Sequence, residues 1–135
     1  MIVTAIVAIL AAIALPNYAD YIKRGKIVEA TSALSDARVR FEQSYLDNRT
    51  YAAAGACNAI QTAAGGPVKS FDLDCCTTAP TATTYSCTAT GKATEGMSGF
   101  LYTINQANQK TSTITASGWS GNANCWAVRR DGSCS

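Results

Sequence analysis

Six cysteines are the side chains with the clearest chemistry in this 135-residue chain. They are Cys57, Cys75, Cys76, Cys87, Cys125 and Cys134. An even number of cysteines in a loop-rich region is typical of disulfides formed in an oxidising compartment, such as the periplasm or the cell exterior. Zinc is disfavoured, because zinc sites use CxxC-type pairs and the one close pair here is adjacent. We therefore expect disulfides and neither a metal nor another cofactor.

Other side chains give little support for catalysis. The chain contains no histidine, which excludes histidine-dependent triads and general bases and most catalytic zinc sites. Asp72 and Asp74 could form a carboxylate pair on one strand face, but alternating solvent-side charges explain them better. Trp119 and Trp126, with Tyr102, could form a sugar-binding platform, although packing in the core is favoured. No catalytic residue is predicted, and we expect a protein that is not an enzyme.

Positive charge is modest, with a formal net charge of +2. The candidates for contacts with DNA phosphates are Lys69, Lys92, Lys110, Arg129 and Arg130. Apart from the adjacent Arg129 and Arg130 they are scattered along the chain, so a solvated surface is the favoured explanation.

The elements that must position these residues begin with an apolar run of fifteen residues, MIVTAIVAILAAIAL. Its large apolar side chains are Met1, Ile2, Val3, Ile6, Val7, Ile9, Leu10, Ile13 and Leu15. At about 1.5 Å per residue the run reaches only about 22 Å, short of the roughly 20 residues that a bilayer needs. A core helix of the head is the alternative, but apolar residues on all sides of the helix favour a membrane or a bundle of helices as the cover. A signal peptide is disfavoured, because no basic stretch precedes the run and no clear cleavage site follows it.

An amphipathic helix is predicted over residues 17–48. Its apolar positions recur at steps of three and four, at Ile27, Ala30, Leu34, Ala37, Phe41 and Tyr45. Pro16 lies between this helix and the apolar run, and we expect a break there, as a bend or a melted turn.

The rest of the chain predicts a sheet. Residues 49–67 are small, polar and rich in glycine, which indicates a long loop. Four β-rich runs follow within residues 68–116, at 68–75, 83–90, 99–105 and 111–116, and their short links favour an antiparallel meander. The amphipathic helix would cover its apolar face, so the fold class is α+β.

Residues 117–135 contain CWAVRRDGSC, where a Cys125–Cys134 bond would close a rigid surface loop around the turn Asp131-Gly132. For the other four cysteines the residues alone leave the pairing open. Cys75 and Cys76 point to opposite faces of an extended strand, so they need different partners.

This arrangement resembles a type IV pilin of the β- and γ-proteobacterial, type IVa-like kind. The opening MIVTAIVAILAAIALPNYADY is similar to the family's N-terminal helix, and CWAVRRDGSC is similar to its disulfide-closed C-terminal region. The resemblance implies pairing of Cys57 with Cys75, which leaves Cys76 for Cys87. The family's stretch with an N-terminal Phe and a Glu before Met-Ile-Val is absent from this sequence, and we expect that the sequence is truncated there.

The resemblance also implies a function and a location. Residues 1–16 would lie in the inner membrane and then, after assembly by the pilus machinery, in the core of an extracellular helical filament of identical subunits. Residues 17–135 would form the head, exposed to the periplasm or exterior, and the filament would serve adhesion, motility or DNA uptake. The alternatives are a minor pilin that binds DNA or a host surface at the tip and a pseudopilin of a secretion system. The pseudopilin is disfavoured because Asp131 is the one acidic residue in the C-terminal region, which supports calcium binding poorly.

Overall fold

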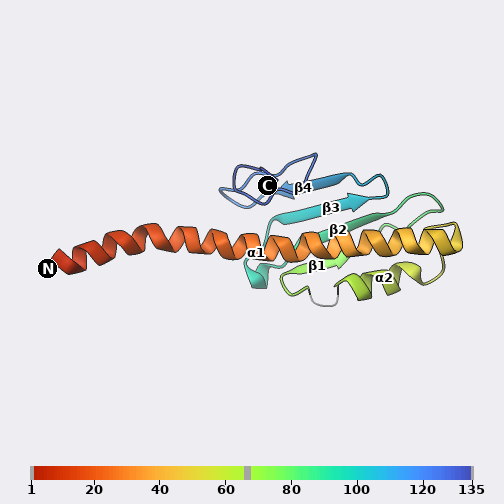
Figure 1. Ribbon diagram of the computed structural model, residues 1–135, viewed down its shortest axis with the longest axis horizontal. Helices are drawn as coiled ribbons and strands as arrows, with labels where there is room; N and C mark the ends of the chain where they lie inside the picture. Colours follow the sequence, from red (N-terminus) through yellow and green to blue (C-terminus); the bar gives the residue numbers. More distant parts are fainter. Residues whose placement is uncertain (1, 66–67, 135) are drawn as a thin grey trace.

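The computed structural model describes residues 2–65 and 68–134, and the side chains of residues 13–16 and 65 lie outside this description. The elements in chain order are α1 (Ile2–Asn48), α2 (Ala56–Gly65), β1 (Phe71–Asp74), β2 (Ser86–Gly91), the short 3-10 helix η1 (Ala93–Glu95), β3 (Phe100–Asn105) and β4 (Lys110–Ile114). Figure 1 shows that the second part of α1 lies along the head, whereas the first part projects away from it. The predicted α+β fold is confirmed.

The predicted stripe on α1 forms the centre of the core. Ile27, Leu34 and Phe41 are fully buried, as are Ala30 and Ala37 between them. These positions lie on one face because their spacing matches the helical period of 3.6 residues. The helix ends where Arg49 adopts a left-handed conformation, with φ of 58°. The Arg49 amide donates to the Tyr45 carbonyl at 2.7 Å, which satisfies one of the last carbonyls of α1.

α1 stays helical through Pro16, so the melted turn, one of the two forms expected there, is wrong, whereas the other form, a bend, agrees with the shape of the helix. The helix runs without interruption from Ile2 to Asn48. A proline removes one backbone donor, but a long helix keeps the hydrogen bonds on either side and can absorb the loss by curving. Figure 1 shows such a curve in the first part of α1.

The predicted loop over residues 49–67 contains a helix instead. Helix α2 has the sequence ACNAIQTAAG, and alanine is the strongest helix former. Ile60 and Ala64 are buried, and α2 packs against α1. The prediction is wrong because the glycines that flank this stretch indicate a loop. Its alanines have small side chains and therefore give only a weak periodic signal for a helix.

The sheet is the predicted antiparallel meander, with strand order β1-β2-β3-β4. Cys87 lies opposite Ile104, and Tyr102 lies opposite Ser112. The inward-facing residues Phe71, Leu73, Tyr85, Cys87, Ala89, Phe100, Tyr102 and Ile104 are buried, whereas Ile114 is half-buried. On β4 the fully inward position is taken by a polar residue, Ser112.

The disulfides differ from the expected pairing in the middle of the chain. Cys57 is bonded to Cys76 and Cys75 to Cys87, so the expected bonds Cys57–Cys75 and Cys76–Cys87 are wrong. The reason is strand phase: Cys75 is buried in line with Phe71 and Leu73. It therefore faces inward beside Cys87, with 4.1 Å between their Cα atoms, and leaves the outward Cys76 to the cysteine of α2.

Candidate functional site

The first part of α1, described at the side-chain level over residues 2–12, is an exposed apolar surface. Among its side chains, Ile2 is 78% exposed, Ile9 63% and Leu10 62%, and Val3, Ile6 and Val7 are also exposed. By length and composition α1 could cross a membrane, and none of the apolar window that passes this test is buried in the fold. The core-helix alternative is therefore wrong. Met1 and the side chains of Ile13, Leu15 and Pro16 lie outside the described part of the structure.

A second set of exposed apolar side chains continues along α1 beside the head. Tyr21 and Leu46 are each 74% exposed, Val28 is 59% exposed and Val39 53%. Their steps of seven, eleven and seven residues are close to whole numbers of helical turns, so these four residues lie on one line. We call them the outer stripe; it lies about half a turn from the buried face that begins at Ile27. This stripe was not predicted, although its spacing is readable in the sequence.

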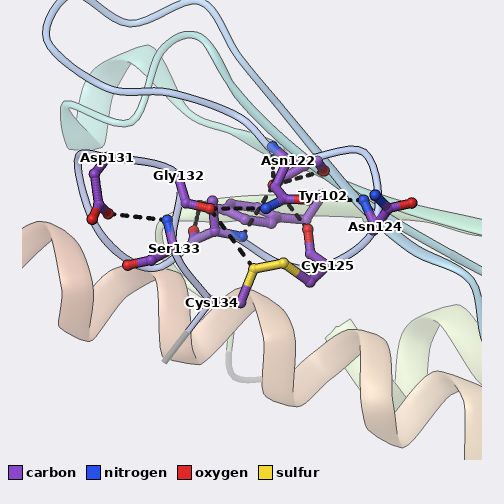
Figure 2. Close-up of a disulfide and its surroundings, with 10 residues drawn as sticks. Tyr102, Asn122, Asn124, Cys125, Asp131, Gly132, Ser133 and Cys134 are labelled. Atoms are coloured by element: carbon purple, nitrogen blue, oxygen red, sulfur yellow. Dashed lines mark hydrogen bonds between the residues drawn. A yellow bond between two sulfur atoms is a disulfide. The ribbon is translucent and has the colours of Figure 1, made fainter.

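The C-terminal disulfide closes a loop whose inside is hydrogen-bonded to the sheet. Cys125 is bonded to Cys134, so the predicted disulfide-closed C-terminal loop is present. Figure 2 shows the network around this bond, in which the Asn122 side chain donates to the Gly132 carbonyl at 3.0 Å. The buried Tyr102 hydroxyl donates to the Ala127 carbonyl at 2.9 Å. These contacts hold the loop in one conformation.

Ser112 explains why a polar residue occupies the inward position of β4. Its hydroxyl accepts hydrogen bonds from the amides of Asn122 and Ala127, both at 3.0 Å. The same hydroxyl donates to the Cys125 carbonyl at 3.0 Å. The Ser112 amide also donates to the Asn122 carbonyl at 2.7 Å. One buried side chain therefore satisfies backbone groups at both ends of the segment from Asn122 to Ala127.

The same loop is attached to α1 by a bidentate ion pair. Arg130 Nε lies 2.6 Å from Asp20 Oδ2, and its Nη2 donates to Asp20 Oδ1 at 2.7 Å. Nearby, Lys26 Nζ donates to the Glu95 carbonyl at 2.6 Å and joins η1 to α1. Neither Asp20 nor Lys26 was predicted as a contact residue, because contacts between residues so far apart in the chain leave no local pattern.

The structure does not bring the five candidate DNA contacts together. Lys92 pairs with Asp72 at 3.2 Å, and Arg130 pairs with Asp20. Lys110 Nζ lies 4.5 Å from the centre of the Trp126 ring, a cation–π contact that leaves its charge unneutralised. The side chains of Lys69 and Arg129 are exposed and form no ion pair with another described residue.

Lys110 borders a groove of the head with a volume of about 540 Å³. The groove lies between the β3–β4 turn and the C-terminal region, and its polar lining includes Asn105, Asn108, Gln109 and Asn124. None of its lining residues is acidic, so an anion there would meet amides and one cation. The Asn105 side chain is already engaged, because it donates to Gln109 Oε1 at 2.7 Å.

The other chemical candidates have structural roles. Asp74 accepts hydrogen bonds from the amides of Cys76 and Thr77, both at 2.9 Å, and these bonds, with one from the Thr77 hydroxyl, lower its pKa. Trp119 packs edge-on against Phe100 at 5.3 Å, and Trp126 Nε1 donates to the Thr103 carbonyl at 2.8 Å. Among the described residues no group of three or more metal-ligating side chains could hold an ion.

Comparison with known proteins decides the family. A family model described as "Type IV minor pilin ComP, DNA uptake sequence receptor" matches residues 16–99, more than half of the chain. The chain belongs to this family. Its family and fold are those of structural pilins. No curated protein sequence matches it.

A solved structure supports the pilin fold. The chain is similar to the non-core minor pilin PilV of Neisseria meningitidis, with a TM-score of 0.56 and 16% sequence identity. The match covers 71% of this chain and 91% of PilV. At this identity the likeness concerns the fold alone.

Proposed function

We propose that this pilin is a minor subunit of a type IV pilus and enters the filament through the first part of α1. The observation that carries the proposal is the exposure of that part on all sides, while the second part of the same helix packs on a sheet. Lipid tails and the apolar side chains of neighbouring helices are similar solvents. The segment can therefore lie in the inner membrane before assembly and among the helices of other subunits afterwards.

The outer stripe supports the same proposal. It extends the apolar surface along α1, and exposed apolar side chains in a line mark a surface that another protein covers. The neighbours in the filament are identical copies or other pilins, each with an apolar helix of its own. The head then faces the exterior, where its three disulfides persist.

The test places one charge in the segment. We expect Ile9→Lys to abolish recovery of the chain in sheared pili, because a lysine among apolar helices or lipid tails costs about 3 kcal/mol. Ile9→Leu is the matched control and should assemble normally. The measurement is the amount of the chain in the pilus fraction relative to the membrane fraction. Normal recovery of the lysine variant would overturn the proposal, provided that its head keeps the same disulfides.

DNA binding is the second candidate, and the match to a family described as a DNA uptake sequence receptor favours it. The exposed Lys69 and Arg129 and the unneutralised Lys110 are the candidate contacts to phosphate. Lys92 and Arg130 are weaker candidates, since each already pairs with a carboxylate.

Salt dependence tests this candidate on the full chain in detergent. Affinity for a DNA duplex should fall steeply with salt, and Lys69→Gln or Arg129→Gln should each reduce the slope of log affinity against log salt by about 1. Arg24→Gln removes the same charge from the exposed side of α1 and serves as the control. Comparing a short sequence over-represented in the bacterium's own genome with a shuffled duplex measures specificity. No measurable binding at low salt would exclude the DNA role and leave the pilus role intact.

A further inference from the structure

The loop between β1 and β2 has an unusual composition. Residues 77–84 read TTAPTATT, so this stretch contains threonine, alanine and proline alone. No helix or strand lies between Asp74 and Ser86, and every residue of the stretch is exposed except the half-buried Pro80. Exposed segments rich in threonine and proline are typical of O-glycosylated proteins. Their hydroxyls are accessible, and the absence of regular structure leaves the backbone open to an enzyme.

The hydroxyls of this loop are not equivalent. Thr81 Oγ1 and Thr84 Oγ1 lie 2.6 Å apart and form a hydrogen bond, and the Thr77 hydroxyl bonds Asp74. The hydroxyls of Thr78 and Thr83 take part in none of the hydrogen bonds found among the described residues. A hydroxyl that is bonded within the chain must give up that bond before a transferase base can take its proton, so Thr78 and Thr83 are the more available acceptors.

The loop is also held in a fixed place. The Cys57–Cys76 and Cys75–Cys87 bonds secure its first residues and the strand that follows it. The Ala82 carbonyl accepts a hydrogen bond from the Tyr51 amide at 3.3 Å, which joins the far side of the loop to the link after α1. Thr78 and Thr83 therefore project from a rigid support that a covalent addition would not unfold.

We propose that this loop is an O-glycosylation site, with Thr78 or Thr83, or both, as the acceptor. In this reaction a threonine Oγ1 attacks the anomeric carbon of a sugar carried on a pyrophosphate. The new carbon–oxygen bond forms as the bond from that carbon to the pyrophosphate oxygen breaks. The pyrophosphate leaves with the electron pair, and a base of the transferase takes the hydroxyl proton. Pilus assembly and DNA binding do not require this modification, so the inference goes beyond the proposed function.

Other exposed threonines provide the contrast. Thr62 is exposed but lies within α2, and Thr113 is exposed but lies within β4. A transferase that takes its acceptor from a loop would have to unwind the helix or detach the strand to reach them. They should remain unmodified, although their hydroxyls are as accessible to solvent as those of the loop.

The test is mass spectrometry of the full chain purified from its own bacterium. We expect an intact mass above that of the disulfide-bonded sequence by whole sugar residues. Fragmentation that keeps sugars attached should place them on Thr78 or Thr83. The double variant Thr78→Ala/Thr83→Ala should lose the whole increment, whereas the matched control Thr62→Ala should retain it. Equal thermal midpoints of the two variants would show that the loss does not come from misfolding.

Two results would overturn the proposal. One is a native chain with the unmodified mass, and the other is a sugar increment that maps to residues outside the loop or persists in the double variant. Neither result depends on whether the chain enters pili, because the mass is measured on membrane-extracted and pilus-extracted chains separately. Failure of this inference is thus distinguishable from failure of the proposed function.

Discussion

At the scale of single residues, the adjacent cysteines show how strand phase decides a chemical bond. Leu73 and Cys75 are two residues apart and both face the core, so Cys75 meets the inward Cys87 of the neighbouring strand. Cys76 faces the other way and reaches α2, which carries Cys57. Period-two alternation contains this answer, because Cys87 is in phase with the inward Tyr85 and Ala89. The expectation drawn from family resemblance overrode that signal.

Asp74 gives a prediction that depends on pH. Hydrogen bonds from Thr77 and Cys76 stabilise its carboxylate and lower its pKa. A carboxyl with a lowered pKa in the folded state stabilises the fold above its unfolded pKa and loses this contribution as pH falls through the folded value. We expect Asp74→Asn to lower the free energy of unfolding by about 1 kcal/mol at pH 7. The difference from wild type should shrink as pH falls below the ordinary aspartate pKa and disappear once the folded-state carboxyl is protonated, because both side chains are then neutral.

Denaturant titrations of both chains at several pH values measure this difference. Asp72→Asn is the matched control, because Asp72 is an exposed carboxylate on the same strand and pairs with Lys92 at the surface. Its effect should be small at every pH. A constant difference between Asp74→Asn and wild type across the pH range would contradict the assigned role of the carboxylate.

At the scale of elements, the C-terminal loop depends on α1 for its position. Arg130 and Asp20 form the bidentate pair, in which the Arg130 side chain is 52% exposed and the Asp20 side chain 16% exposed. A pair with one partner open to solvent contributes little to global stability, about 1 kcal/mol. We therefore expect Arg130→Ala to leave the thermal midpoint nearly unchanged but to speed amide hydrogen exchange in residues 128–134, since those amides lose their attachment to α1.

The reciprocal variant Asp20→Ala should give the same exchange pattern, and the double variant should add nothing, because either change removes the whole contact. Arg129→Ala is the neighbouring control and should leave exchange in the loop unchanged. Additive effects of the two single variants would show that Arg130 and Asp20 act independently, contrary to the geometry.

The sequence predicted the elements with strong periodic signals. The stripe from Ile27 to Phe41 and the alternation in β3 each repeat a large apolar residue at the period of their element, so both were predicted. Helix α2 was missed because alanine contrasts weakly with its polar neighbours. The contacts of Ser112 and Asp20 were not predicted, because each contact joins segments that are distant in the chain. A serine or an aspartate at one position does not indicate which distant residue it will contact. In the candidate site the apolar segment was therefore predictable, whereas the arrangement of the cations was not.

At the scale of the whole molecule, one helix belongs to two environments. Its second part is a component of the head, with Leu34 and Phe41 fully buried. Its first part makes no contribution to the head, because none of its apolar window is buried there. Folding of the head and burial of the apolar segment are thus separate events. The continuous helix α1 links the head to the apolar segment.

This separation predicts two different outcomes of removing residues 1–16. The six apolar side chains Ile2, Val3, Ile6, Val7, Ile9 and Leu10 are exposed. Their burial is worth about 9–18 kcal/mol at most, at roughly 1.5–3 kcal/mol each. The full chain should therefore form large assemblies without detergent, and the shortened chain should sediment as a monomer. Head stability should nevertheless be equal in the two chains, because the removed residues are not part of its core.

Analytical ultracentrifugation without detergent and thermal unfolding in one detergent measure the two outcomes. Because the shortened chain keeps all three disulfides and the buried face of α1, its midpoint should lie within about 2 °C of that of the full chain, a shift that corresponds to less than about 1 kcal/mol. A full chain that sediments as a detergent-free monomer would contradict the first outcome, since its apolar segment would then need a cover within its own head. A midpoint lowered by many degrees on shortening would contradict the second, since it would mean that the segment stabilises the head by contacts the fold does not contain.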